Sequence, residues 1–273
     1  MIKDSEYREL TNLVYQNFGI ALGHEKRTMV THRLQSWILE QGFNTFQDYL
    51  NYLKKDIQGT ALMSLANRLT TNYSYFYRES EQLEFFFKKG LPQKNSQTIQ
   101  PGNSTLNIWS AGCASGEEPY CIAMLLYEFF DSSFVQWDMG ILATDLDTVI
   151  LQEAHKGVYR EDRLNRLPPN YKLKYLKPDR KGFWSVDDSL KKLVHFTRYN
   201  LIRDQFSFKN KFFAIFCRNV MIYFDQQTIN ALVERFYHVL EDGGYLIIGQ
   251  TESLDKSKTK LTYVAPSIYQ KRV

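Results

Sequence analysis

The chain has 273 residues, of which 44% are hydrophobic and 23% charged, so its length and composition are those of a globular protein. Lys and Arg total 34 against 30 Asp and Glu, which leaves a net charge of +4. This excess is too small to indicate nucleic-acid binding, which usually needs a clustered basic surface. The sequence contains no apolar run close to the ~20 residues of a membrane span, and its first ten residues lack the apolar stretch of a secretory signal.

The cysteines and histidines argue against a metal centre. Cys113, Cys121 and Cys217 are odd in number and lack the spacing of zinc ligands. The five histidines are scattered and form no HExxH pair. We therefore expect a reduced, cytoplasmic protein without a metal site and without membrane insertion.

The N-terminal part of the chain has helical periodicity. Apolar residues recur every three or four positions in four stripes, over residues 7–18, 29–38, 46–53 and 62–69. Four short amphipathic helices predict a small all-α domain, which we place at residues 1–87. The next stretch contains two prolines, two glycines and few apolar residues, which indicates a linker at residues 88–104.

The remaining residues, 105–273, alternate between short apolar runs and helical patterns. Strands are expected at 106–111, 139–144, 212–217 and 245–249, with helices at 122–130 and from Asp225 to 240. The final stretch, 263–271, is a candidate edge strand. This alternation predicts an α/β domain with a mostly parallel sheet. The polar region of about 155–196 interrupts the rhythm and is interpreted as an insertion.

A glycine loop gives the strongest local signal. Residues 107–120 read NIWSAGCASGEEPY, in which a buried strand leads through Gly112 and Gly116 into a helix. Such a loop lets the backbone and the helix N-terminus approach a nucleotide-type cofactor. The alternative is that both glycines only permit a turn.

The residues around this loop favour a cationic ligand over a pyrophosphate. Neither GxGxxG nor GxxxxGK[ST] is present. Instead Glu117 and Glu118 begin the helix, where they would repel a pyrophosphate. S-Adenosylmethionine carries a sulfonium and an amino group and no phosphate, so the loop favours a methyltransferase over a dehydrogenase.

Further polar residues follow the other predicted strands. Asp145 ends the second strand, where a carboxylate can accept hydrogen bonds from ribose hydroxyls. Arg218 and Asn219 follow the strand at 212–217, and Tyr223 comes shortly after. The alternatives are a helix cap for Asp145, a surface charge for Arg218 and a rim residue for Tyr223.

Four strings in this order resemble the CheR-type chemoreceptor methyltransferases: TTNYSYFYRE at 70–79, WSAGCASGEEPY at 109–120, ATDLD at 143–147 and FCRNVMIYF at 216–224. The resemblance covers nearly the whole chain. It implies an N-terminal all-α domain followed by a Rossmann-like methyltransferase domain that carries a small β-subdomain as an insertion. It also implies methyl transfer from S-adenosylmethionine to glutamate side chains of receptor cytoplasmic helices. The products would be glutamyl methyl esters and S-adenosylhomocysteine.

The resemblance also implies site residues, position by position. Cofactor contacts carry over to Asn72, Ser74, Arg78, Gly112, Glu118, Asp145, Asn200, Leu201, Arg218 and Asn219. Ser74 stands where threonine is common in the family, and its hydroxyl can make the same bond. Arg78 and Tyr223 are the candidates for catalytic roles, the first by orienting the substrate carboxylate and the second by holding the donor or lining the methyl channel.

Two departures from the family pattern concern the substrate. The basic face of the second helix is reduced to Lys26, Arg27 and Arg33, which we expect to contact the receptor. The insertion is short, and its stretch YLKPDRKGFWSV at 175–186 has a single glycine, Gly182. We therefore expect activity that is independent of a receptor C-terminal pentapeptide. We also expect a monomer that associates with receptor arrays and binds no nucleic acid.

Three other functions are compatible with parts of the sequence. The same cofactor site could serve a methyltransferase that acts on RNA or on a small molecule, although the weak basic character disfavours RNA. A non-catalytic scaffold would not need Arg78, Asp145, Asn219 and Tyr223 together. A nicotinamide-dependent dehydrogenase is the least favoured, because its glycine motif is missing.

Overall fold

The computed structural model describes residues 2–57, 59–70, 73–97 and 104–272 and divides into two compact units. The first unit comprises Met1–Asn72, Asn200–Asp204 and Tyr223–Ile229. The second comprises Tyr73–Tyr199, Gln205–Ile222 and Asn230–Val273. The two units are thus interleaved along the chain, and the first boundary falls near residue 72 instead of residue 87.

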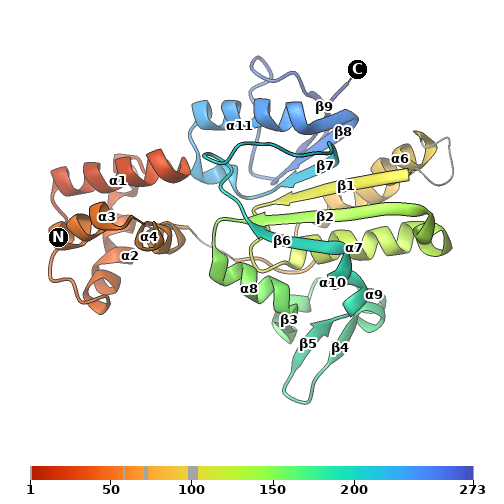
Figure 1. The fold of residues 1–273 in the computed structure, drawn as a ribbon, viewed down its shortest axis with the longest axis horizontal. Helices are drawn as coiled ribbons and strands as arrows, with labels where there is room; N and C mark the ends of the chain where they lie inside the picture. The colour runs from red at the N-terminus through yellow and green to blue at the C-terminus, as the bar shows by residue number, and fades with distance from the viewer. Residues whose placement is uncertain (1, 58, 71–72, 98–103, 273) are drawn as a thin grey trace. The chain divides into compact units, whose positions relative to one another are not determined.

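The first unit is helical, as its periodicity predicts. Its helices are α1 (Asp4–Phe18), α2 (Arg27–Glu40), α3 (Phe46–Lys55) and α4 (Thr60–Leu69), with a short 3-10 turn η1 (His24–Lys26) (Figure 1). The apolar stripes meet in a core of fully buried residues that includes Leu10, Val14, Val30, Leu34, Leu50 and Leu65. Gly19 ends α1 in the left-handed conformation, with a φ of 73°, and its N–H donates to the Tyr15 carbonyl.

Two later segments of the chain complete this helical unit. The N–H of Ala21 donates to the Tyr223 carbonyl at 2.8 Å, and Ile20 forms an antiparallel bridge with Phe224. The side chain of Asn200 donates to the Asn17 carbonyl at 2.8 Å. Backbone hydrogen bonds therefore join residues 223–224 to the chain just after α1.

The second unit contains a seven-stranded sheet in the order β6-β2-β1-β7-β8-β10-β9 (Figure 1). Its strands are β1 (Ser104–Ala111), β2 (Trp137–Asp145), β6 (Val194–Arg198), β7 (Phe212–Cys217), β8 (Leu240–Ile248), β9 (Thr262–Ala265) and β10 (Ile268–Gln270). The first five in spatial order are parallel, and β10 pairs antiparallel with β8 on one side and with β9 on the other. The mostly parallel sheet is confirmed, but the C-terminal stretch forms two strands where one was expected.

Alternate residues of β1 face the two sides of this sheet. Ile108 belongs to the large core cluster that contains the buried face of α7 (Glu117–Phe130). Trp109 points to the opposite side, where its ring packs within about 5 Å of Phe206 and Phe236. The other helices of this unit are α5 (Ser80–Phe85), η2 (Phe86–Gly90), α6 (Leu91–Gln97), η3 (Asp131–Gln136), α8 (Thr148–Lys156) and α10 (Asp188–Leu193). The elements η5 (Met221–Tyr223) and α11 (Gln226–Val239) each have residues in both units.

Residues 88–97, expected to be part of a linker, are helical. The π-helix η2 leads directly into α6, and Phe86 and Leu91 are fully buried in the core of the second unit. Lys94 forms an ion pair with Glu241 at 2.6 Å. This segment is an integral part of the second unit. The rest of the expected linker, up to residue 103, lies outside the described residues.

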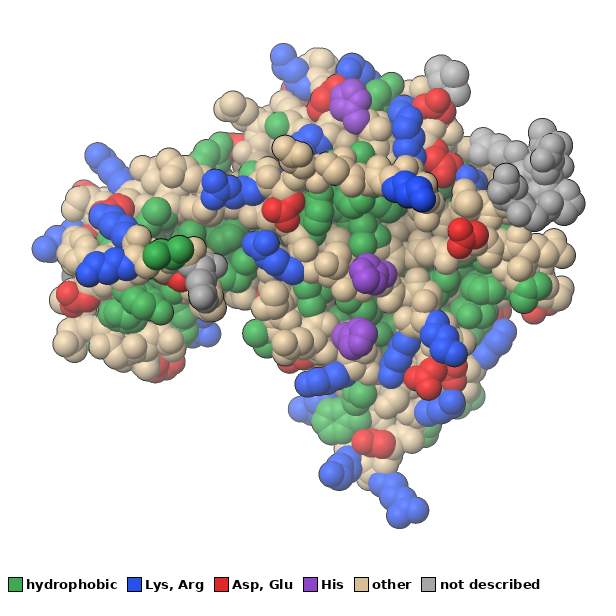
Figure 2. All heavy atoms as spheres, viewed as in Figure 1, with side chains coloured by type: hydrophobic (Ala, Val, Ile, Leu, Met, Phe, Trp, Pro, Cys, Tyr) green, Lys and Arg blue, Asp and Glu red, His purple; other side chains and the backbone are tan. Residues whose placement is uncertain are grey.

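The insertion forms a small antiparallel sheet in the order β3-β5-β4. Its elements are β3 (Val158–Arg160), η4 (Glu161–Leu164), α9 (Pro169–Tyr175), β4 (Leu176–Pro178) and β5 (Phe183–Val186). It is shorter than the expected 155–196, because β6 pairs in parallel with β2 in the main sheet. Residues 158–186 carry eight Lys and Arg against three Asp and Glu, a net charge of +5 that exceeds that of the whole chain. Figure 2 shows basic side chains gathered over this subdomain.

Among the helices that the structure describes, none is both long enough and apolar enough to cross a membrane.

Candidate functional site

The candidate site lies at one edge of the main sheet. The strands β2, β1, β7 and β8 are neighbours and run parallel, so their carboxyl ends meet at this edge. The glycine loop follows β1, Asp145 ends β2, and Arg218 and Asn219 follow β7. Residues from three of the sequence motifs are thereby brought to one place, as the topology predicts.

The glycine loop is tied to the end of β2. The N–H groups of Gly112 and Cys113 donate to the Thr144 carbonyl at 2.7 and 2.9 Å. Gly112 has a φ of 87°, and a Cβ there would lie 2.3 Å from the side chain of Val220. A side chain at this position would therefore meet both a strained backbone and a steric clash.

Asp145 closes the other side of this loop. Its Oδ2 accepts a hydrogen bond from the Ala114 N–H at 2.9 Å, and its Oδ1 accepts one from the Asp147 N–H at 3.0 Å. Burial raises the pKa of this carboxyl, and the backbone N–H groups partly offset the effect. A carboxylate offers about four lone-pair sites, so Asp145 can still accept a bond from a ligand hydroxyl.

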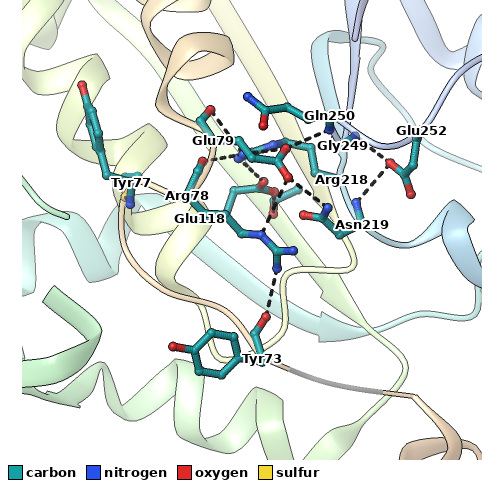
Figure 3. Close-up of polar contacts among 12 residues, drawn as sticks. Tyr73, Tyr77, Arg78, Glu79, Glu118, Arg218, Asn219, Gly249, Gln250 and Glu252 are labelled. Atoms are coloured by element: carbon teal, nitrogen blue, oxygen red, sulfur yellow. Dashed lines mark hydrogen bonds and ion pairs between the residues drawn. The ribbon is translucent and has the colours of Figure 1, made fainter. Parts of the chain in front are cut away.

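Arg218 is the centre of a buried network of charges (Figure 3). Its side chain is only 3% exposed and pairs with Glu118 at 2.9 Å and with Glu79 at 3.3 Å. It also donates to the backbone carbonyl of Arg78. Glu118 accepts a second hydrogen bond from Ser110 at 2.7 Å. The guanidinium therefore joins the helix α7 to the segment that precedes α5.

Asn219 is held in a left-handed conformation beside this network. Its φ is 59°, its side-chain amide donates to Glu79 at 3.0 Å, and its backbone N–H donates to Glu252 at 3.1 Å. Glu252 also accepts from the N–H groups of Gly249 and Ile222, at 2.6 and 3.1 Å. A Cβ at Gly249 would lie 2.8 Å from the Asn219 nitrogen. The Glu252 carboxylate thus joins the turn after β7 to the turn after β8 through hydrogen bonds.

The acids of this network have opposite pKa shifts. Burial alone would raise the pKa of Glu79, but the hydrogen bond from Asn219, the Arg218 guanidinium and the N–H of Gln250 outweigh it and leave the pKa below its usual value. Burial raises the pKa of Glu252, and its hydrogen bonds from backbone N–H groups only partly compensate. Glu79 is therefore a firmly ionised partner for Arg218.

Glu79 and Glu252 are site residues that the sequence reasoning missed. Glu79 is the last residue of the string TTNYSYFYRE, so a signal existed, but the motif predicted only its neighbour Arg78. Glu252 lies three residues beyond Gly249 in no recognisable pattern, and only the tertiary structure reveals its contacts.

Arg78 stands at the more open side of the network. Its guanidinium donates to the Tyr73 carbonyl at 3.0 Å and lies 3.9 Å from Glu79, and its side chain remains 30% exposed. Ser74 is in the same segment, and its hydroxyl lies close enough to Glu117 to lower the pKa of that acid. The expected site residue Asn72 lies outside the described residues.

Three of the residues expected to contact or flank the cofactor belong to the first unit. Asn200 and Leu201 follow β6, and Tyr223 follows the turn after β7. The Asn200 carboxamide oxygen accepts from the N–H groups of Ile202 and Arg203, at 3.0 and 3.2 Å. Leu201 is buried and Tyr223 is half-buried. The structure therefore groups Ser74, Arg78, Gly112, Glu118, Asp145, Arg218 and Asn219 in one unit and these three in the other.

The basic residues expected to contact the substrate all make contacts within the helical unit. Lys26 donates to the Ala21 carbonyl at 3.0 Å, and Arg33 donates to the Leu69 carbonyl at 2.6 Å. Arg27 donates to the Ile2 carbonyl at 2.7 Å and forms an ion pair with Asp4. A substrate acid would compete with these contacts.

The chemistry of the second unit's site fits S-adenosylmethionine. Glu79 and Glu118 pair with one arginine, Arg218, and the glycine loop holds a third carboxylate, Asp145. The loop from Gly112 to Gly116 contains no Lys or Arg that would bind a phosphate. A ligand with cationic groups and a ribose, and without phosphate, matches this set of donors and acceptors.

Comparison with known proteins gives the same cofactor. Residues 72–269 match the family model described as CheR methyltransferase, SAM binding domain, and residues 5–70 match CheR methyltransferase, all-alpha domain. The break between the two matches coincides with the boundary between the two units near residue 72.

Relatives resemble the chain over nearly its whole length. A chemotaxis protein methyltransferase of Borreliella burgdorferi is 42% identical over 270 residues, which cover 99% of this chain and 95% of that protein. A chemotaxis protein methyltransferase of Escherichia coli is 32% identical, covering 98% and 91%. Chemotaxis protein methyltransferase 2 of Vibrio cholerae is 35% identical, covering 94% and 88%.

Proposed function

Because the chain belongs to the CheR methyltransferase family, we propose that it methylates chemoreceptors, with glutamate side chains as acceptors and glutamyl methyl esters as products. The strongest support is the 42% identity, over nearly the full length, to a chemotaxis protein methyltransferase. The charge network around Arg218 supports it further, since it lies within the part of the chain that matches the SAM binding domain.

The chemistry asks little of the protein in the way of acid–base catalysis. A glutamate side chain has an ordinary pKa of about 4.3, so the acceptor is already ionised at neutral pH and needs no general base. When bound, S-adenosylmethionine supplies a methyl group activated by its sulfonium. The residues of the site must then orient the acceptor oxygen in line with that methyl group, and orientation can lower a barrier by roughly 7–11 kcal/mol.

Individual roles follow from the positions of the side chains. Asp145 is suited to accept a hydrogen bond from a ribose hydroxyl, because it ends β2 beside the glycine loop and keeps acceptor capacity. Glu118 and Asn219, fixed by Arg218 and Glu79, are suited to hold the cationic methionine end of the cofactor. We assign adenine contacts to Asn200 and Leu201, and a place beside the donor to Tyr223.

Arg78 is assigned the role of orienting the substrate carboxylate, because its guanidinium is anchored at Tyr73 and still partly exposed. Arg78→Ala is expected to lower kcat/KM for the receptor by about 100-fold, the typical effect of losing orientation. Arg78→Lys keeps the charge without the two-pronged geometry and should recover only part of the loss. Wild-type kcat/KM and cofactor affinity in Arg78→Ala would refute this role.

Substrate recognition is assigned to Lys26, Arg27 and Arg33 of the helical unit, without a receptor tether. The hairpin from β4 to β5 turns at residues 179–182, where Asp179 accepts from the N–H groups of Lys181 and Phe183. This short turn leaves little chain to grip a peptide. We expect isothermal calorimetry with a receptor C-terminal pentapeptide to show no binding at micromolar concentrations, and micromolar affinity would contradict the proposal.

The decisive experiment is methyl transfer from labelled S-adenosylmethionine to membranes that contain chemoreceptors, followed by treatment with base. Release of the label as volatile methanol is expected, because base hydrolyses a carboxyl methyl ester. Label that survives base would point to methylation at nitrogen or at another atom and would exclude the glutamate ester. If no label is transferred although calorimetry shows cofactor binding, a receptor substrate of these membranes is excluded.

A further inference from the structure

The inserted subdomain touches both halves of the cofactor site. In β3, the Tyr159 hydroxyl donates to the carbonyl of Ser115 in the glycine loop at 2.6 Å. The same ring packs edge-on against Phe76 at 4.8 Å between centroids. The loop after β1 and the segment that carries Ser74 and Arg78 therefore rest on the same side chain of the insertion.

The first residue of α7, Glu117, is a buried acid that the proposed mechanism does not use. Its side chain is 0% exposed, and its Oε2 accepts a hydrogen bond from Ser115 at 2.7 Å. Within the part of the chain that the structure describes, its Oε1 accepts no well-formed hydrogen bond, and the guanidinium of Arg163 lies 3.5 Å from it. Leaving a carboxylate buried without a cation is costly, so Arg163 matters to this acid.

The surroundings of Glu117 determine how it titrates. Burial raises its pKa, while hydrogen bonds from Ser115 and its own backbone N–H, the charge of Arg163 and the Ser74 hydroxyl act in the opposite direction. The other titratable groups that face it are Tyr159 of β3, Cys113 of the glycine loop and Cys121 of α7. Burial raises the pKa of all three of these groups, so Arg163 is the cation that offsets the charge of Glu117.

Arg163, in η4 of the insertion, also binds the segment before α5 in three ways. Its guanidinium donates to the carbonyl of Ser74 and lies 4.7 Å from the centre of the Tyr73 ring. Its own carbonyl accepts the Phe76 N–H at 3.1 Å. One residue of the insertion thus contacts the chain at Tyr73, Ser74 and Phe76 and reaches Glu117 at the start of α7.

We infer that Arg163 is a positioning residue for the cofactor site. By neutralising Glu117 and holding the carbonyl of Ser74, it fixes residues 73–79 against the glycine loop, so that Ser74 and Arg78 are in place before the cofactor binds. The inserted subdomain is in this way a structural part of the cofactor site. The inference needs only S-adenosylmethionine binding and not the identity of the methyl acceptor, so its test is independent of any receptor.

The test compares Arg163→Ala, Glu117→Gln and the double variant with the wild-type enzyme. Arg160→Ala is the matched control, because Arg160 lies in the same insertion, is 75% exposed and pairs only weakly with Asp162, at 3.7 Å. One readout is the Kd for S-adenosylhomocysteine by calorimetry between pH 6 and pH 8.5. The other is hydrogen exchange of residues 73–79 in the cofactor-free protein.

In Arg163→Ala we expect about a tenfold weaker Kd at pH 8 and faster exchange of residues 73–79. Without the cation the pKa of Glu117 rises further. Lowering the pH then protonates Glu117 and removes its unpaired charge. The loss of affinity for S-adenosylhomocysteine should therefore become smaller at low pH. The double variant, which carries a neutral Gln at position 117, should recover much of the affinity at pH 8 and lose this pH dependence.

Two outcomes would overturn the inference. One is a Kd and an exchange rate in Arg163→Ala equal to those of Arg160→Ala. The other is a loss of cofactor affinity that does not depend on pH and that Glu117→Gln does not relieve. In that case Arg163 would act only by packing and not by neutralising Glu117. If Arg163→Ala does not fold, Arg163→Lys provides the test. Lysine keeps the positive charge near Glu117 but lacks the two parallel N–H donors of the guanidinium. The Kd of this variant should therefore retain the wild-type pH dependence, while residues 73–79 exchange faster.

Discussion

At the scale of single residues, backbone strain is concentrated at the candidate site. Four non-glycine residues there have a positive φ, namely Tyr77, Glu79, Ala114 and Asn219. Such conformations cost of order 1–3 kcal/mol each and persist where the surroundings fix them. The carboxylates of Glu79, Asp145 and Glu252 supply that fixation, because each accepts hydrogen bonds from a strained residue or its neighbour. The site is thus built before a ligand arrives.

Replacing Glu79 by Gln tests whether a carboxylate at this position stabilises the folded site. The change leaves Arg218 with one carboxylate partner instead of two and is expected to lower the free energy of unfolding by about 1–3 kcal/mol at pH 7. The folded pKa of Glu79 lies below its ordinary value, so its contribution to stability is complete above that ordinary pKa and is lost as the pH falls through the lower folded pKa. The difference in urea denaturation between wild type and Glu79→Gln should stay constant from pH 8 to pH 5 and shrink below about pH 4.5.

The control for this comparison is Glu81→Gln, at an exposed position two residues further on. It should leave the unfolding free energy nearly unchanged at every pH. A stability difference for Glu79→Gln that grows as the pH falls from 7 to 6 would mean that the folded pKa of Glu79 is raised and that the acid is poorly paired.

At the scale of elements, periodicity and turn residues predicted most of the fold. The strand at 212–217 has the predicted limits, and the four N-terminal helices lie where the apolar stripes placed them. Residues 88–97 differ because Gly90 and Pro92 were interpreted as turn residues. In the structure Gly90 lets the chain pack closely, since a Cβ would lie 2.7 Å from the Phe86 ring. Pro92 follows Leu91, whose N–H donates to the Phe86 carbonyl, so the residue without an N–H stands where the π-helix η2 passes into α6.

Motifs could locate only part of the candidate site. Glu118, Asp145, Arg218 and Asn219 follow strands or begin a helix, so topology alone brings them to one edge. Glu79, Glu252 and Arg163 act through partners far away in the chain, and no local pattern distinguishes them from solvated surface charges.

Leu91→Ala distinguishes an integral helix from a linker. Leu91 is fully buried in the core of the second unit, so its truncation should lower the free energy of unfolding by about 2–5 kcal/mol. Lys89→Ala, at an exposed position two residues earlier, should change stability by no more than about 0.5 kcal/mol. Urea denaturation followed by circular dichroism measures both, and equal midpoints for the two variants would show that α6 does not contribute to the core.

At the scale of the whole molecule, the chain crosses between its two units several times. The first unit ends near residue 72 and is completed by Asn200–Asp204 and Tyr223–Ile229. Asn200 and Tyr223, both proposed to contact the cofactor or lie beside it, are held by hydrogen bonds to residues that follow or end α1. The stability of these segments should therefore be that of the helical unit and not that of the neighbouring strands.

Native-state hydrogen exchange of the full chain in increasing urea tests this division. Peptides that cover residues 200–204 and 223–229 should open with the same free energy and urea dependence as α1. Peptides from β1 and β7 serve as the internal reference for the second unit. If residues 200–204 and 223–229 instead open together with β7, the two-unit description is wrong for these segments.

The interleaving of the two units also has a consequence for synthesis. The four N-terminal helices leave the ribosome first, but the partners of Ala21 and Asn17 are residues 223 and 200. At a translation rate of about 5–20 residues per second, on the order of ten seconds pass between synthesis of the four helices and synthesis of the residues that complete their unit. During that interval Ile20, buried in the finished protein, has no bridge to Phe224, so the nascent chain exposes a short edge that a chaperone can cover. The helical unit can be completed once residue 229 has been made, whereas the second unit also needs β8, β9 and β10, which are made later.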